Sequence, residues 1–76
     1  MKLNITVFKP TGKYYTDGIA ELPGKNPVLH TKEFLNFVRD NLPARLTGGF
    51  VLVQNADPNS NEFYTHLYRY DDLMSM

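Results

Sequence analysis

The side chains best suited to contacts or chemistry gather in one stretch near the carboxyl end, residues 62–70. If this stretch is a strand, alternate side chains point to opposite faces of a sheet. One face carries Tyr64, His66, Tyr68 and Tyr70, and the other carries Phe63, Thr65 and Leu67, with Arg69 at its margin. A small domain needs only one apolar face for its core. We therefore expect the tyrosine face to point away from the core and to form a contact surface, joined by Tyr14 from an earlier strand.

Such a surface has two possible interpretations, a platform for nucleic acid and an interface with a protein. Tyrosines on a sheet resemble the base-stacking platforms of single-strand nucleic-acid binders, where each stacked base contributes roughly 1–3 kcal/mol. Those platforms sit beside basic side chains, and this strand contains only Arg69. Tyrosines also pack across strands and into subunit interfaces, because they combine a large apolar area with a hydroxyl group. The charge balance favours packing or an interface, and nucleic-acid or nucleotide binding remains the alternative.

Catalytic and metal-binding patterns are weak in this chain. His30 and His66 are the only histidines, and neither has a partner at helical i, i+3 or i+4 spacing or lies in an HExxH pattern. The pair Gly48-Gly49 precedes a strand, whereas a phosphate cradle needs a helix behind its glycines. The pair therefore predicts a turn or a close packing point. We expect no catalytic residue, no metal site and no cofactor.

Size, charge and hydropathy limit the classes of protein further. The chain has 76 residues, which suits one domain that buries only about 60% of its unfolded surface. It has no cysteine, which removes disulfides and thiolate chemistry and favours a reducing cytoplasm. Eight basic and eight acidic residues cancel, unlike the basic excess of a phosphate-binding surface. The longest apolar run, residues 50–53, is too short to span a membrane, and we expect no signal peptide.

Four segments have the composition of strands. They are Lys2–Phe8, Tyr14–Leu22, Phe50–Val53 and Glu62–Tyr70. The first alternates strictly, with Leu3, Ile5 and Val7 on one side. The Pro10-to-Lys13 segment has the residues of a hairpin turn. Asp17-Gly18 interrupts the return strand, and we expect a β-bulge there with Gly18 as the permissive residue.

One segment, residues 31–42, has the pattern of a helix. Thr31 is a suitable N-cap and Glu33 suits the positive end of the helix dipole. The apolar side chains at helical spacing are Phe34, Leu35, Val38 and Leu42. Residues 71–76 have the composition of a frayed tail. The order predicts a single α+β domain over residues 1–76, ββαββ, with an antiparallel sheet and one helix packed on one face.

The opening hairpin resembles a known group of proteins. Residues 6–17, Thr-Val-Phe-Lys-Pro-Thr-Gly-Lys-Tyr-Tyr-Thr-Asp, followed by Gly18, resemble the start of small uncharacterised proteins encoded by actinobacterial phages. These proteins similarly begin with a strand, a Lys-x-x-Gly-Lys turn and an aromatic-Tyr-Thr return strand. The resemblance covers about the first third of the chain and implies a phage accessory protein acting inside a bacterial cell. It implies no functional residues.

Together these patterns predict a non-catalytic interaction protein. We expect it to bind itself, as a homodimer, or a bacterial host protein through the sheet face opposite the helix. The expected contact residues are Tyr64, His66, Tyr68, Tyr70 and Tyr14. The alternative is single-stranded nucleic acid or a nucleotide on the same tyrosine-rich face. The expected location is the cytoplasm of the host cell, without a membrane partner.

Overall fold

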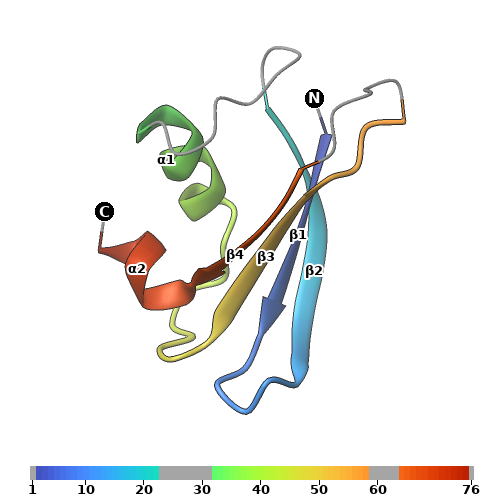
Figure 1. Ribbon diagram of the computed structural model, residues 1–76. Helices are drawn as coiled ribbons and strands as arrows, with labels where there is room; N and C mark the ends of the chain where they lie inside the picture. Colours follow the sequence, from blue (N-terminus) through green and yellow to red (C-terminus); the bar gives the residue numbers. More distant parts are fainter. Residues whose placement is uncertain (1, 23–31, 59–63, 76) are drawn as a thin grey trace.

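The computed structural model describes residues 2–22, 32–58 and 64–75. Within these ranges the elements are β1 (Lys2–Phe8), β2 (Tyr14–Glu21), α1 (Lys32–Asp40), β3 (Phe50–Asn55), β4 (Thr65–Arg69) and α2 (Tyr70–Met74). The strands form one antiparallel sheet in the order β2-β1-β3-β4. Both helices lie on the same side of the sheet (Figure 1). The expected α+β class is confirmed, and the ββαββ order is followed by a second short helix.

The amino-terminal hairpin follows the predicted alternation. Leu3, Ile5 and Val7 are buried at 0%, 4% and 2% exposure because their side of β1 faces the helices. The turn closes with two backbone hydrogen bonds, from Lys9 N to Lys13 O and from Gly12 N to Lys9 O, both 2.8 Å. Gly12 has φ +87°, a conformation that glycine adopts without steric cost.

The predicted position of the β-bulge, at Gly18, is wrong, because the bulge lies next to the hairpin turn. The β1–β2 register shifts between Val7 and Phe8, where Tyr15 is the extra residue of β2. Gly18 pairs with Ile5 in regular register, so it needs no special conformation. Because the shift occurs next to the turn, the rest of β2 pairs with β1 without interruption.

Helix α1 buries the predicted apolar stripe. Phe34, Leu35 and Val38 are buried, while Leu42 lies beyond the helix and packs against the core partly exposed. The α-helix ends at Asp40 because the next backbone bond, Asn41 N to Val38 O at 3.1 Å, is the tighter i to i−3 type. The expected N-cap Thr31, together with His30, Glu62 and Phe63, lies outside the described residues.

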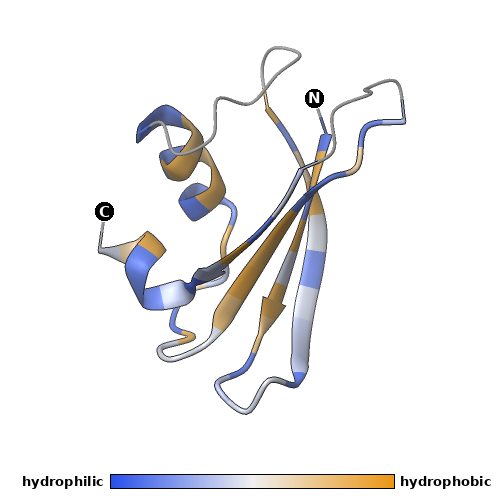
Figure 2. Cartoon of the chain, viewed as in Figure 1, coloured by the Kyte–Doolittle hydropathy of each residue, from blue (hydrophilic) through white to orange (hydrophobic). Residues whose placement is uncertain are grey.

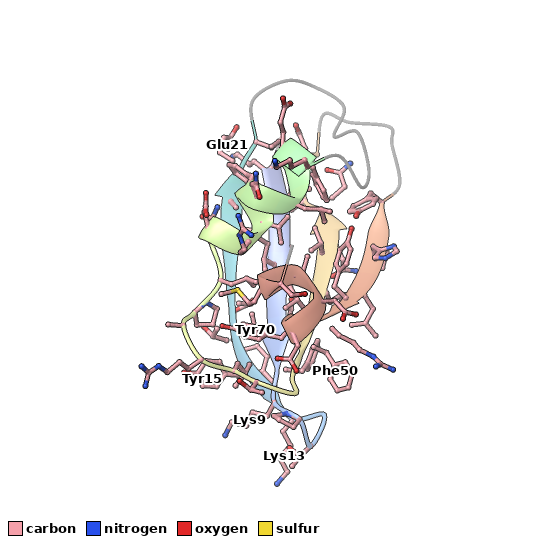
Figure 3. All side chains as sticks on the ribbon, turned by 90° about the vertical axis from the view of Figure 1, so that its left-hand side faces the viewer. Lys9, Lys13, Tyr15, Glu21, Phe50 and Tyr70 are labelled. Carbon is pink, nitrogen blue, oxygen red and sulfur yellow. The ribbon has the colours of Figure 1, made fainter. Side chains whose placement is uncertain are left out.

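The carboxyl end is packed against the domain, where a frayed tail was expected. The structure places residues 70–74 in α2, and Leu73 is completely buried. Tyr70 N donates to Gly49 O at 2.9 Å, and Gly48 N donates to the Asp71 carboxylate at 3.2 Å. The physical reason is the short length of α1, nine residues, which leaves the other end of the sheet for α2 to cover (Figure 3). No helix in the described ranges is long and apolar enough to cross a membrane.

Candidate protein-interaction surface

The tyrosines at the carboxyl end lie on the helix side of the sheet, which corrects the expected orientation. Tyr64, Tyr68 and Tyr70 are only 7%, 7% and 3% exposed. Their orientation follows from the register of β3 and β4, where Tyr68 pairs with Val51 and His66 pairs with Val53. Both valines are completely buried beneath the helices. Tyr64, His66, Tyr68 and Tyr70 therefore do not form the face opposite the helix, and the three tyrosines belong to the core.

Large rings suit this position because two short helices must cover the sheet. The Phe34 ring of α1 meets the Tyr64 ring edge-on at 5.8 Å, and the His66 and Tyr68 ring centroids are 4.2 Å apart. The buried hydroxyls have partners. Those of Tyr64 and Tyr68 share a hydrogen bond of 3.0 Å, and the hydroxyl of Tyr70 donates to Pro43 O at 2.7 Å. Because a paired buried hydroxyl costs little, tyrosine can fill this space in place of phenylalanine.

Burial also changes the acidity of this hydroxyl pair. Burial is the largest cause raising the pKa of Tyr64, and the hydrogen bond shared with Tyr68 raises that pKa further. Burial likewise raises the pKa of Tyr68, against a smaller lowering by the bond to Tyr64. In both cases the folded protein holds the proton more tightly than the unfolded chain does.

We therefore expect loss of stability at alkaline pH. Both folded pKa values lie above the unfolded value of about 10, so the stabilisation is complete below about pH 10 and decreases as the pH rises above it. Each of the two hydroxyls contributes a slope of up to about 1.4 kcal/mol per pH unit. Circular dichroism and tyrosinate absorbance, followed together in an alkaline titration, should change in one transition for this pair.

The matched variant is the double substitution of Tyr64 and Tyr68 by phenylalanine. It removes both partners of the hydrogen bond at once, which is nearly neutral at pH 7, and it should extend the folded range to higher pH. Ionisation of all tyrosines near pH 10 with unchanged circular dichroism would contradict the prediction.

The opposite side of the sheet, here called the open face, has no described element over it. Its residues are the side chains of each strand that point away from the helices. They are Lys2, Asn4, Thr6 and Phe8 on β1, Tyr14, Asp17, Ile19 and Glu21 on β2, Phe50, Leu52 and Gln54 on β3, and Thr65, Leu67 and Arg69 on β4. Two large apolar side chains stand out on it, Ile19 at 62% and Leu67 at 58% exposure. Leu52 pairs with Leu67 and adds a partly buried neighbour. The apolar run of β3, visible in Figure 2, thus supplies both faces of the sheet.

Charged side chains of the open face lie mainly towards its edges. Asp17 is on the edge strand β2 and Arg69 is on the edge strand β4. Lys2 and Glu21 pair at one end of the β1–β2 ladder. The Tyr14 hydroxyl donates to Asp17 Oδ1 at 2.6 Å, and this hydrogen bond is the main cause raising the pKa of Tyr14.

Of the five predicted contact residues, only Tyr14 lies on the open face. It pairs with Phe8 and is 58% exposed, whereas Tyr64, Tyr68 and Tyr70 are buried on the other side. Sequence reasoning missed Ile19 and Leu67. For Ile19 a signal was available in the alternation of the hairpin, since Ile19 pairs with the polar Asn4, whose neighbours Leu3 and Ile5 occupy the core side. Leu67 had no such signal, because both faces of its strand carry plausible core residues.

A shallow groove of about 420 Å³ lies on the helix side, between β2 and the segment that follows α1. It exists because β2 presents the small residues Gly18 and Ala20 there, and it is bordered by Asp40, Leu42 and Pro43. Among the residues that the structure describes, no three His, Cys, Asp or Glu side chains gather in a way that could hold a metal ion.

The fold and this surface define a class, a small α+β domain whose two described helices cover one face of its sheet and whose other face has no described element over it. Searches against family models, curated proteins and solved structures found no match to the chain.

Proposed function

We propose that the protein is a non-catalytic phage accessory protein that binds another protein surface through the open face, inside the bacterial host cell. The observation that carries the proposal is the exposure of two large apolar side chains, Ile19 and Leu67, on one uncovered sheet face. Exposed apolar groups mark a contact site when they form a contiguous patch. Ile19 and Leu67 lie on the two edge strands, and the strands between them carry the partly buried Phe8, Phe50 and Leu52 on the same face. The phage context is supported by the resemblance of residues 6–18.

The distribution of charge supports a protein partner. The open face combines two basic residues, Lys2 and Arg69, with two acidic residues, Asp17 and Glu21, so it lacks the basic excess that neutralises phosphates. Charges at the rim are usual in a protein interface, and on this face Asp17 and Arg69 lie on the edge strands beside Ile19 and Leu67. The nucleic-acid alternative loses its main support, because the tyrosine rings that would stack on bases are buried beneath the helices.

The test is the substitution of Leu67 by serine. We expect binding to another protein surface to weaken by about tenfold or more, since a large apolar group leaves the interface. Thermal unfolding followed by circular dichroism should change little, because Leu67 is 58% exposed. Binding is measured as self-association by sedimentation and as recovery of a stoichiometric partner from host lysate.

Met74→Ser is the matched control. Met74 is also an exposed apolar side chain, at 46%, but it lies on α2 on the covered side of the sheet. It should keep full binding. Equal binding by the two variants would overturn the proposal, as would a loss of folding in the Leu67 variant, which would place that residue in the core.

A further inference from the structure

The charges and apolar groups of the open face are arranged so that the face is complementary to itself. We propose that its occupant is a second copy of the chain, packed face to face about a two-fold axis parallel to the strands, with Arg69 of each copy against Asp17 of the other. This inference rests on the proposed function and adds the identity and orientation of the partner.

The strand order places the two charges where such an axis needs them. Asp17 is on β2 and Arg69 is on β4, the two opposite edges of the described sheet. A two-fold axis that runs parallel to the strands between two stacked sheets lays β2 of one copy over β4 of the other. Asp17 of each copy then lies over the strand that carries Arg69 of the other, one row away along the strand, and the contact occurs twice because the axis is two-fold.

The alternative axis, in the plane but perpendicular to the strands, is disfavoured by the same charges. It would lay β2 over β2 and β4 over β4. Asp17 and Glu21 of the acidic edge would then face the acidic edge of the other copy, and like charges across an interface are costly. Charge complementarity therefore selects the axis parallel to the strands.

The position along the strand also fits. Residues that pair with one another across the four strands form a row perpendicular to the strands. Arg69 shares a row with Phe50, Phe8 and Tyr14. Asp17 is in the next row on this face, with Thr6, Leu52 and Leu67. One row is about 7 Å, which an arginine side chain can span. The Tyr14 hydroxyl, which comes from the row of Arg69, donates to Asp17 Oδ1 at 2.6 Å. The Asp17 carboxylate is therefore hydrogen-bonded to the residue over which Arg69 of the second copy would lie.

The same operation covers the apolar groups. With β1 over β3, Phe8 of one copy faces Phe50 of the other. Leu67 on β4 lies over the row of the second copy's Asp17, one row of about 7 Å from Ile19 on the same strand β2. The two most exposed of these side chains, Ile19 and Leu67, are therefore buried in one step. The formal net charge of the chain is zero at pH 7, so two copies carry no overall repulsion. Sheets packed in this way lie about 10 Å apart.

The test exchanges the charges. In Arg69→Asp alone, both contacts become acid against acid, and in Asp17→Arg alone, both become base against base. We expect each single variant to weaken self-association by about tenfold or more. An equimolar mixture of the two should form a heterodimer, because each contact then joins an aspartate to an arginine. Native mass spectrometry with one variant isotopically labelled separates homodimer from heterodimer.

The outcomes separate this inference from the proposed function. A monomeric unmodified protein at high concentration would overturn the second copy as occupant. If a partner from host lysate is then bound by Met74→Ser and lost by Leu67→Ser, the proposed function still stands. A dimer that Leu67→Ser weakens but the single charge variants leave intact, or a mixture that forms no heterodimer, would overturn this orientation alone. A dimer that Leu67→Ser also leaves intact would overturn both.

Discussion

Replacing Gly49 by alanine is expected to remove a large part of the protein's free energy of unfolding. A Cβ at this position would lie 2.4 Å from the Phe8 carbonyl oxygen, a backbone atom, and 3.1 Å from two side-chain carbons of Leu46. The glycine cannot move away easily, because its N–H donates to Leu46 O at 3.0 Å and its carbonyl accepts from Tyr70 N at 2.9 Å. Overpacking against a fixed backbone costs about 2–4 kcal/mol. A domain of this length has only about 4–11 kcal/mol of stability.

Gly18→Ala is the matched control for this prediction. No atom lies within 4 Å of the Cβ it would add, and Gly18 is a regular strand residue paired with Ile5. The substitution should be neutral or stabilise the protein by about 0.5–1 kcal/mol, because alanine loses less chain entropy on folding. Urea unfolding of both variants measures the difference. Similar free energies of unfolding would show that the close packing at Gly49 has no energetic weight.

Leu73→Ala is expected to have the second large effect, a loss of about 2–5 kcal/mol. Leu73 is completely buried, and α2 alone is too short to be helical in water. The helix therefore exists because Leu73 packs into the core and because the backbone bonds from Tyr70 and Gly48 hold its first turn. Removing the side chain leaves a cavity and releases the element that covers one end of the sheet.

Met74→Ala separates packing from helix propensity. Met74 is the next residue of the same helix and is 46% exposed, so its substitution should change the free energy of unfolding by no more than about 0.5 kcal/mol. Amide hydrogen exchange should show protection of the α2 N–H groups that is lost in the Leu73 variant. If residues 71–76 were a frayed tail, the two variants would behave alike.

The orientation of β4 is the clearest case in which alternation alone was insufficient. Its two faces both carry plausible core residues, tyrosines on one and Leu67 on the other. The choice depends on the partner strand, since Val51 and Val53 of β3 are the residues that face the helices. It also depends on the width of the space beneath two short helices, which aromatic rings fill. Neither quantity is local to residues 62–70.

The sequence did not predict the carboxyl-terminal helix α2, for a related reason. Five residues with two adjacent acids, Asp71 and Asp72, have little tendency to form a helix. Helix formation here depends on contacts with Gly48 and Gly49, more than twenty residues earlier in the chain. The predicted role of that glycine pair as a turn or close packing point agrees with the structure: Gly48 has φ +82° and Gly49 touches Phe8.

Short-range patterns were enough to predict the buried side of β1, the turn at Gly12, the apolar stripe of α1 and the ββαββ order of elements. These depend on alternation, helical spacing and backbone conformation, all of which act within a few residues. Three features came from long-range packing alone: which face of β4 is covered, the helical packing of residues 70–74, and the presence of Ile19 and Leu67 on one open surface. Each of these depends on pairing and packing between distant segments, whose free energy no single segment contains.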